Sequence, residues 1–100
     1  MLKAHLQAVR TLLTPPENWT QNAGARDIDG NQTYDPTLAK SWCLYGAIGR
    51  TNPDGPAYTA CVLALRAQLG DHRISVFNDD PNTTHPMVLD LIDRTIAATP

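Results

Sequence analysis

The sequence predicts an α+β fold that is mainly helical, with about four helices, a small β-hairpin near residues 23–34 and a short extended segment near residues 74–77. Two observations lead to this prediction. Apolar residues recur every three or four positions over most of the chain, which is typical of amphipathic helices. Residues 17–34 lack that period and contain the dipeptide Asp29-Gly30, which favours a tight turn between two strands.

The first two helices are predicted from apolar spacing and from residues that stop or start a helix. One covers about residues 2–13 and ends before Pro15, because the residue before a proline disfavours the α region. The next covers about residues 42–50, with Ser41 as its N-cap. Gly46 inside this helix costs stability relative to alanine, which suggests that another backbone segment comes close there.

The second half of the chain is expected to hold two more helices. One begins near Pro56, and Gly70 suits the position just after its end. Ile74 and Val76 then alternate with polar residues and predict the extended segment. Thr84 can cap the last helix.

Composition limits the classes of protein to which the chain can belong. With 100 residues and no repeat or linker, we expect a single domain over residues 1–100. The 8 basic and 10 acidic residues give a net charge of −2 without any basic run, which argues against a nucleic-acid partner and against an anionic membrane surface. The N-terminus does not resemble a signal peptide and no stretch is long enough to span a membrane. We therefore expect a cytoplasmic protein whose two cysteines are free thiols.

Four short motifs follow one another along the chain. They are W-T-Q at residues 19–21, A-x-D-x-x-G at 25–30, W-C-x-x-G-A at 42–47 and F-N-D at 77–79. Their order resembles a family of small uncharacterised proteins found in phages and in bacteria, especially actinobacteria, which carries only a domain-of-unknown-function label. The resemblance covers nearly the whole chain and implies an order of elements and a phage or bacterial setting, but no activity. One departure is Phe77, where the family usually has tryptophan.

Cys43 is the residue that is best suited to act as a nucleophile. At the start of a helix its thiolate would be stabilised by backbone amides, and His72 or His85 could act as its base. The order cysteine, histidine, polar residue resembles that of papain-like thiol hydrolases, but no glycine-rich oxyanion element precedes Cys43. The favoured interpretation is that Cys43 is a buried, slowly reacting residue that packs as a small hydrophobe beside Trp42.

Neither a metal nor another cofactor is expected. In an EF-hand loop centred on Gly30, the first and last ligand positions would fall on Ala25 and Pro36, which carry no carboxylate. No pair among the histidines and cysteines has the spacing of a zinc site. The Asp29-Gly30 segment is therefore interpreted as a structural turn.

Two surfaces are candidates for binding. The first is the hairpin region with Trp19, Gln21 and Arg26, because projecting turns often carry binding residues and a guanidinium suits bidentate contacts. Trp19 is either an exposed anchor or, as the favoured alternative, part of the core. The second surface is Asp79 and Asp80, whose side chains are either an acidic cluster or, more simply, partners of backbone amides in a loop.

The sequence therefore predicts a small non-enzymatic interaction protein with a protein partner. The resemblance adds the expectation of a phage-encoded accessory factor that binds and modulates a host protein. The alternative is a cysteine-dependent hydrolase that uses Cys43 with His72 or His85.

Overall fold

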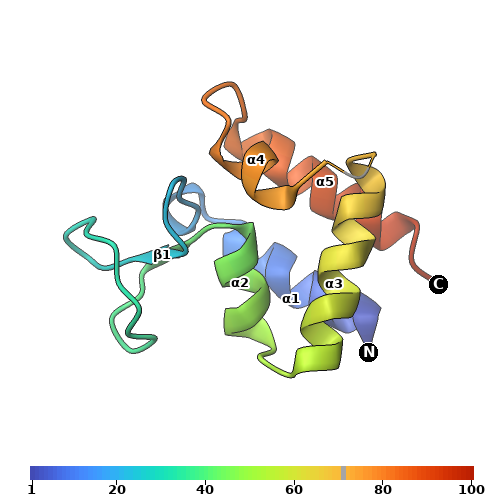
Figure 1. The fold of residues 1–100 in the computed structure, drawn as a ribbon, viewed down its shortest axis with the longest axis horizontal. Coiled ribbons are helices and arrows are strands. Elements are labelled where there is room, and N and C mark those ends of the chain that lie inside the picture. The colour runs from blue at the N-terminus through green and yellow to red at the C-terminus, as the bar shows by residue number, and fades with distance from the viewer. Residues whose placement is uncertain (71) are drawn as a thin grey trace.

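Five α-helices dominate the described chain, which comprises residues 1–70 and 72–100 of a computed structural model (Figure 1). This confirms the mainly helical α+β class. In order, the elements are α1 (Leu2–Leu13), the 3-10 helix η1 (Pro16–Asn18), β1 (Ala25–Arg26), β2 (Ser41–Trp42), α2 (Leu44–Thr51), α3 (Gly55–Gln68), α4 (Ile74–Asp79) and α5 (His85–Ala97).

Helix α1 lies at the centre of the bundle and packs against α2, α3 and α5. Its bounds agree with the predicted residues 2–13. Leu6, Val9 and Leu13 are spaced so that they share one face, and all three are fully buried. Because α1 has neighbours in both halves of the chain, its apolar face organises the bundle.

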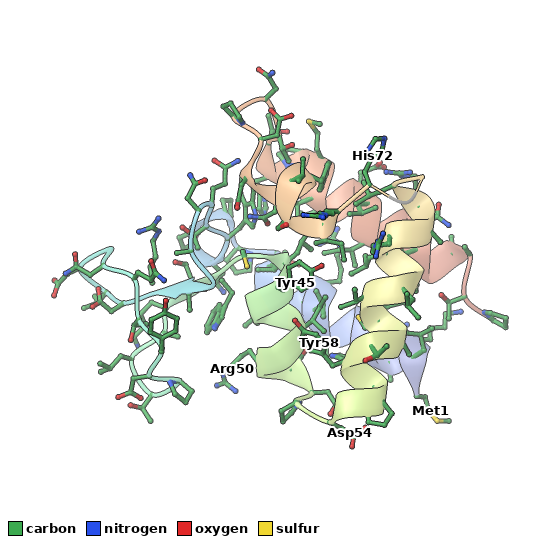
Figure 2. All side chains as sticks on the ribbon, viewed as in Figure 1. Met1, Tyr45, Arg50, Asp54, Tyr58 and His72 are labelled. Atoms are coloured by element: carbon green, nitrogen blue, oxygen red, sulfur yellow. The ribbon has the colours of Figure 1, made fainter. Side chains whose placement is uncertain are left out.

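Helix α2 begins two residues later than predicted. Its N-cap is Cys43 rather than Ser41, because Ser41 and Trp42 have extended backbone that pairs with β1. The helix then continues to Thr51 and packs beside α3. There the rings of Tyr45 and Tyr58 are stacked, with their centroids 6.4 Å apart; both residues are labelled in Figure 2. The prediction of a helix in this region is confirmed, and the predicted cap was wrong.

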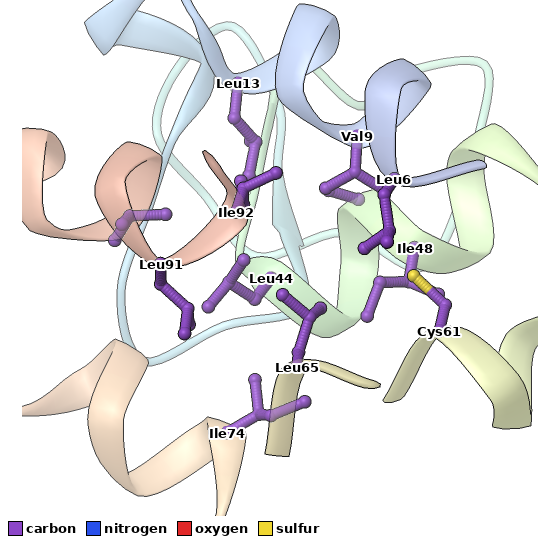
Figure 3. Close-up of a cluster of buried hydrophobic side chains, with 12 residues drawn as sticks. Leu6, Val9, Leu13, Leu44, Ile48, Cys61, Leu65, Ile74, Leu91 and Ile92 are labelled. Carbon is purple, nitrogen blue, oxygen red and sulfur yellow. The ribbon is translucent and has the colours of Figure 1, made fainter. Parts of the chain in front are cut away.

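One apolar core lies between the helices. Leucine and isoleucine supply most of it, and the side chains that meet in Figure 3 come from α1, α2, α3, α4 and α5. The fully buried members are Leu6, Val9, Leu13, Leu44, Ala47, Ile48, Cys61, Leu65, Ile74, Val88, Leu91 and Ile92. Burying each large member contributes about 1.5–3 kcal/mol, so this core is the main source of stability.

Strand β1 pairs with a segment that was not predicted, in addition to the predicted one. The chain does turn after β1, but β1 pairs in antiparallel fashion with β2, with Ala25 opposite Trp42. The predicted second arm, residues 31–34, also lies against β1, through an antiparallel bridge between Arg26 and Gln32 and backbone hydrogen bonds that join Thr33 to Ala25 and Asp27 to Asn31, but it forms no continuous strand. That arm has no alternating apolar face to hold it against the bundle, whereas Trp42 packs against the core.

The segment predicted to be extended, residues 74–77, is instead the start of helix α4. Ile74 and Asn78 are buried and Phe77 packs against the core, which is the i, i+3, i+4 spacing of a helix. Val76 points outward and is 61% exposed. A six-residue helix is too short for its period to be distinguished from strand alternation in the sequence.

Helix α5 begins after its N-cap Thr84, as predicted, and buries Val88, Leu91, Ile92 and Thr95. Gly70 has a φ of +63° just after the C-cap of α3, which is the conformation expected of a glycine at that position. In the described residues, no helix combines the length and apolar character that a membrane span requires.

Candidate functional site

Asn78 is a buried polar residue at the point where three parts of the chain meet. Its Oδ1 accepts hydrogen bonds from Nε1 of Trp19 at 2.8 Å and from the backbone N–H of Leu44 at 3.1 Å. Its Nδ2 donates to the carbonyl oxygen of Thr20 at 3.1 Å and to Oδ1 of Asp79 at 2.9 Å. Only 1% of Asn78 is exposed, so a full set of partners is what makes its burial tolerable. We call this set of contacts the Asn78 hub.

The polar residues beside the hub extend it. Nε2 of Gln21 donates to the carbonyl oxygens of Asn78 and Asp80, each at 2.9 Å. Oδ1 of Asp79 also accepts the backbone N–H of Asn22 at 2.8 Å. The W-T-Q, W-C-x-x-G-A and F-N-D motifs are therefore joined by hydrogen bonds, and their polar residues have a structural role.

Arg26 is also engaged inside the molecule. Its guanidinium donates to Oγ1 of Thr20 at 2.9 Å and to the carbonyl oxygens of Gln21 at 2.9 Å and Gly30 at 3.1 Å. Arg26, which was expected to be free to bind a partner, instead stabilises the turn through these hydrogen bonds. A binding role stays a prediction for the five candidate residues, which are Trp19, Gln21, Arg26, Asp79 and Asp80. A partner that contacts them would find their polar groups already bonded within the molecule.

The A-x-D-x-x-G motif forms the predicted turn. The backbone N–H of Asp27 donates to the carbonyl oxygen of Asn31 at 2.8 Å, which closes a loop of residues 28–30. Oδ1 of Asp27 accepts the backbone N–H groups of Asp29 and Asn31. Gly30 has a φ of +83°, which glycine adopts without the steric cost that other residues meet.

Gly46 in α2 lies against the backbone of Gly24, as the sequence suggested. A Cβ at this position would overlap the Gly24 carbonyl oxygen. The same oxygen accepts the backbone N–H of Cys43 at 3.1 Å. The start of α2 and the segment before β1 are therefore in direct backbone contact, which only glycine allows at position 46.

Cys43 lies at the N-cap of α2 and is partly exposed, rather than buried as predicted. Its sulfur accepts the backbone N–H of Gly46 at 3.3 Å. The thiol faces a groove of about 350 Å³ whose lining includes Tyr45, Ser75 and Asp79. Partial burial raises the pKa of the Cys43 thiol and the Asp79 carboxylate adds to this, although the amides of Gly46 and Tyr45 act in the opposite direction.

The structure does not bring either predicted histidine base to Cys43. Nε2 of His85 is 2.6 Å from the carbonyl oxygen of Leu13, and its ring lies beside Trp19. His72 is exposed in the connection between α3 and α4 (Figure 2). Within the described chain, neither histidine lines the Cys43 groove or forms a hydrogen bond to the sulfur. The thiol and the histidine base that the hydrolase hypothesis requires are therefore not in contact.

We expect the Cys43 thiol to react slowly despite its partial exposure. In a Cys61→Ala variant, iodoacetamide at pH 8 should modify native Cys43 several times more slowly than a short peptide with the same flanking residues, because less thiolate is present. The matched Cys43→Ala variant reports on Cys61, which is fully buried and whose pKa is raised to about 11. Modification of Cys61 should be slower still. Modification of Cys43 faster than the peptide would show an activated thiol.

Residues 27–40, which we call the projecting segment, extend away from the helices (Figure 1). Three large apolar side chains on it are exposed: Ile28 by 79%, Tyr34 by 91% and Leu38 by 52%. None of the twelve core residues lies in this segment. Sequence reasoning missed these three residues, although apolar side chains in a stretch without helical or strand period are a signal of unburied surface.

Among the described residues, no group of three or more histidine, cysteine or acidic side chains is placed to hold a metal ion.

The helical bundle, the Asn78 hub and the projecting segment together define a small mainly α-helical protein whose motif residues serve its architecture. The chain belongs to the family of unknown function DUF6197, whose model matches residues 1–98. This confirms the expected membership of an uncharacterised family. Neither the curated proteins nor the solved structures contain a match to the chain.

Proposed function

We propose that this protein is a small non-enzymatic interaction protein that binds another protein through its projecting segment. The observation that carries the proposal is the exposure of Ile28, Tyr34 and Leu38 on one extension. An isolated exposed apolar residue is common, but several large ones on one projecting element are typical of interaction surfaces. Tyrosine in particular is frequent at the energetic centres of interfaces.

The position of the hub supports the same proposal. Trp19 and Gln21 bond to Asn78 and Asp80, and Asp79 bonds to Asn22, so residues 19–22 are fixed on α4 and the residue after it. Arg26 then links residues 20 and 21 to Gly30 in the projecting segment. In this proposal the five residues contribute to binding by fixing the segment's orientation. A segment that is ordered before it meets its partner loses less conformational entropy on binding.

The biological setting of the proposal rests on the resemblance of the motifs. We propose an accessory factor, encoded by a phage, that acts in the host cytoplasm by binding and modulating a host protein. The proposal includes no nucleic acid, membrane or cofactor. The net charge of −2 without a basic cluster supports the exclusion of nucleic acid.

The proposal is tested by changing the projecting segment. Ile28→Ser, Tyr34→Ser and Leu38→Ser together should change the free energy of unfolding by less than about 1 kcal/mol, because exposed side chains contribute little to stability. The partner is first identified as a stoichiometric complex by cross-linking and mass spectrometry. The affinity of the same triple variant for that partner should be at least about tenfold lower.

A matched control removes three exposed apolar side chains elsewhere. Leu63, Val76 and Met87, on α3, α4 and α5, are 58%, 61% and 43% exposed. Changing all three to serine should leave the partner bound. Loss of the partner in this control but not in the projecting-segment variant would place the binding surface on the helices and refute the proposal.

A further inference from the structure

A groove of about 310 Å³ lies between the projecting segment and α2. Most of its lining is apolar or aromatic, with one basic residue at its edge. The lining residues that matter here are Tyr34, Pro36, Ala39, Trp42, Gly49 and Arg50. The volume is at the low end of ligand-binding clefts, so it suits one large side chain and its neighbour rather than an extended cofactor.

Arg50, which lines the groove, has no carboxylate partner among the ion pairs of the described residues. Arg50 is exposed at the end of α2 and extends away from the bundle (Figure 2). In the described part of the chain it is in neither of the two ion pairs, which are Arg10–Asp93 and Arg94–Asp90. Asp35 also lines the groove and keeps its charge, but it is not paired with Arg50: its Oδ1 accepts the backbone N–H and the hydroxyl of Thr37 at 2.9 and 2.7 Å.

We infer that this groove binds a segment of the partner protein in which an aromatic side chain is followed by a carboxylate. The aromatic ring would lie against Trp42 and Tyr34, where offset stacking adds to the burial of apolar area. The carboxylate would meet Arg50, whose planar guanidinium forms two parallel hydrogen bonds to such a group. The inference rests on the proposed function and specifies the chemistry of the partner.

A surface groove favours a protein segment over a small metabolite. Tyr34 and Arg50 are both exposed at its edge, so a small ligand would keep much of its surface in water, whereas sites for small ligands usually bury most of the ligand. An extended segment needs only its anchor side chain in the groove, and its remaining contacts can lie along the projecting segment.

The test uses two capped hexapeptides that differ only in charge, Gly-Ser-Phe-Asp-Ser-Gly and Gly-Ser-Phe-Asn-Ser-Gly. Binding to the full chain is followed by the NMR signal of the Trp42 indole N–H. We expect the aspartate peptide to bind about tenfold more tightly than the asparagine peptide, which is the effect of one charge-assisted hydrogen-bonded pair. Arg50→Gln should abolish this preference, whereas Arg73→Gln, the same charge change at the exposed start of α4, should preserve it.

Three outcomes would overturn the inference. These are no shift of the Trp42 signal with either peptide, equal affinity for the two peptides, and a preference that survives in Arg50→Gln. Binding of N-acetylphenylalanine without binding of the aspartate peptide would also refute it, since the groove would then take a small aromatic acid. These measurements need no natural partner, so their failure leaves the projecting-segment test of the proposed function open, and the two failures can be told apart.

Discussion

Replacing Asn78 by alanine is expected to lower the free energy of unfolding by about 3 kcal/mol or more. The variant removes four side-chain hydrogen bonds and leaves the N–H groups of Trp19 and Leu44 without their acceptor. Unpaired buried donors cost about 1–3 kcal/mol each, which exceeds the net value of an ordinary hydrogen bond. Urea unfolding followed by circular dichroism measures the change.

Two further variants separate the hub from general effects of substitution. Asn82→Ala changes an exposed asparagine whose backbone N–H, not its side chain, bonds to Asp80. It should change stability by less than about 0.5 kcal/mol. Trp19→Phe keeps an aromatic side chain but removes one hub donor, which should cost at least about 1 kcal/mol. If Asn78→Ala were as stable as Asn82→Ala, the hub would contribute nothing to stability.

Replacing Gly46 by alanine is expected to destabilise the protein by about 2 kcal/mol, although alanine is the better helix former. The gain in helix propensity is about 1 kcal/mol. The new Cβ would overlap the backbone carbonyl of Gly24, which cannot move aside as a flexible side chain could. Overpacking of this kind costs about 1–3 kcal/mol and sometimes more. The free energy of unfolding in urea should therefore fall.

Gly49 supplies a control in the same helix with the opposite expected sign. A Cβ at Gly49 would meet Cε2 of Tyr58 at 3.7 Å, which is an ordinary contact. Gly49→Ala should therefore stabilise the protein by up to about 1 kcal/mol. A stability gain in both variants would mean that the contact between Gly24 and α2 is loose in solution.

The features that the sequence predicted well are those controlled by local chemistry. Helix α1 was predicted with its correct bounds because its apolar spacing is regular and Pro15 and Pro16 follow it. The close approach at Gly46 was inferred because a glycine inside a helix is costly without such a reason. In both cases the signal lies in one short stretch of sequence, although the partner of Gly46, which is Gly24, could not be identified from it.

Features that depend on distant residues were not predicted. The pairing of β1 with β2 and the four partners of Asn78 are set by the packing of the bundle, and no local pattern encodes them. Cys43 was expected inside a helix because the extended backbone of Trp42, which is imposed by that pairing, could not be foreseen. The exposed side chains of the projecting segment were missed although the stretch lacks a helical or strand period, because that signal does not show where the bundle ends.

The separation of the hub's partners along the chain has a consequence for the order of folding. Bonds from Asn78 and its neighbours reach residues 57 to 59 positions earlier, so the loop between them must close before any of these bonds forms. Helices α2 and α3, which are consecutive and in contact, can associate first. Stopped-flow measurements on Asn78→Ala should therefore show faster unfolding with a nearly unchanged refolding rate, as expected if residues 19–21 dock on α4 only after the main barrier to folding has been crossed.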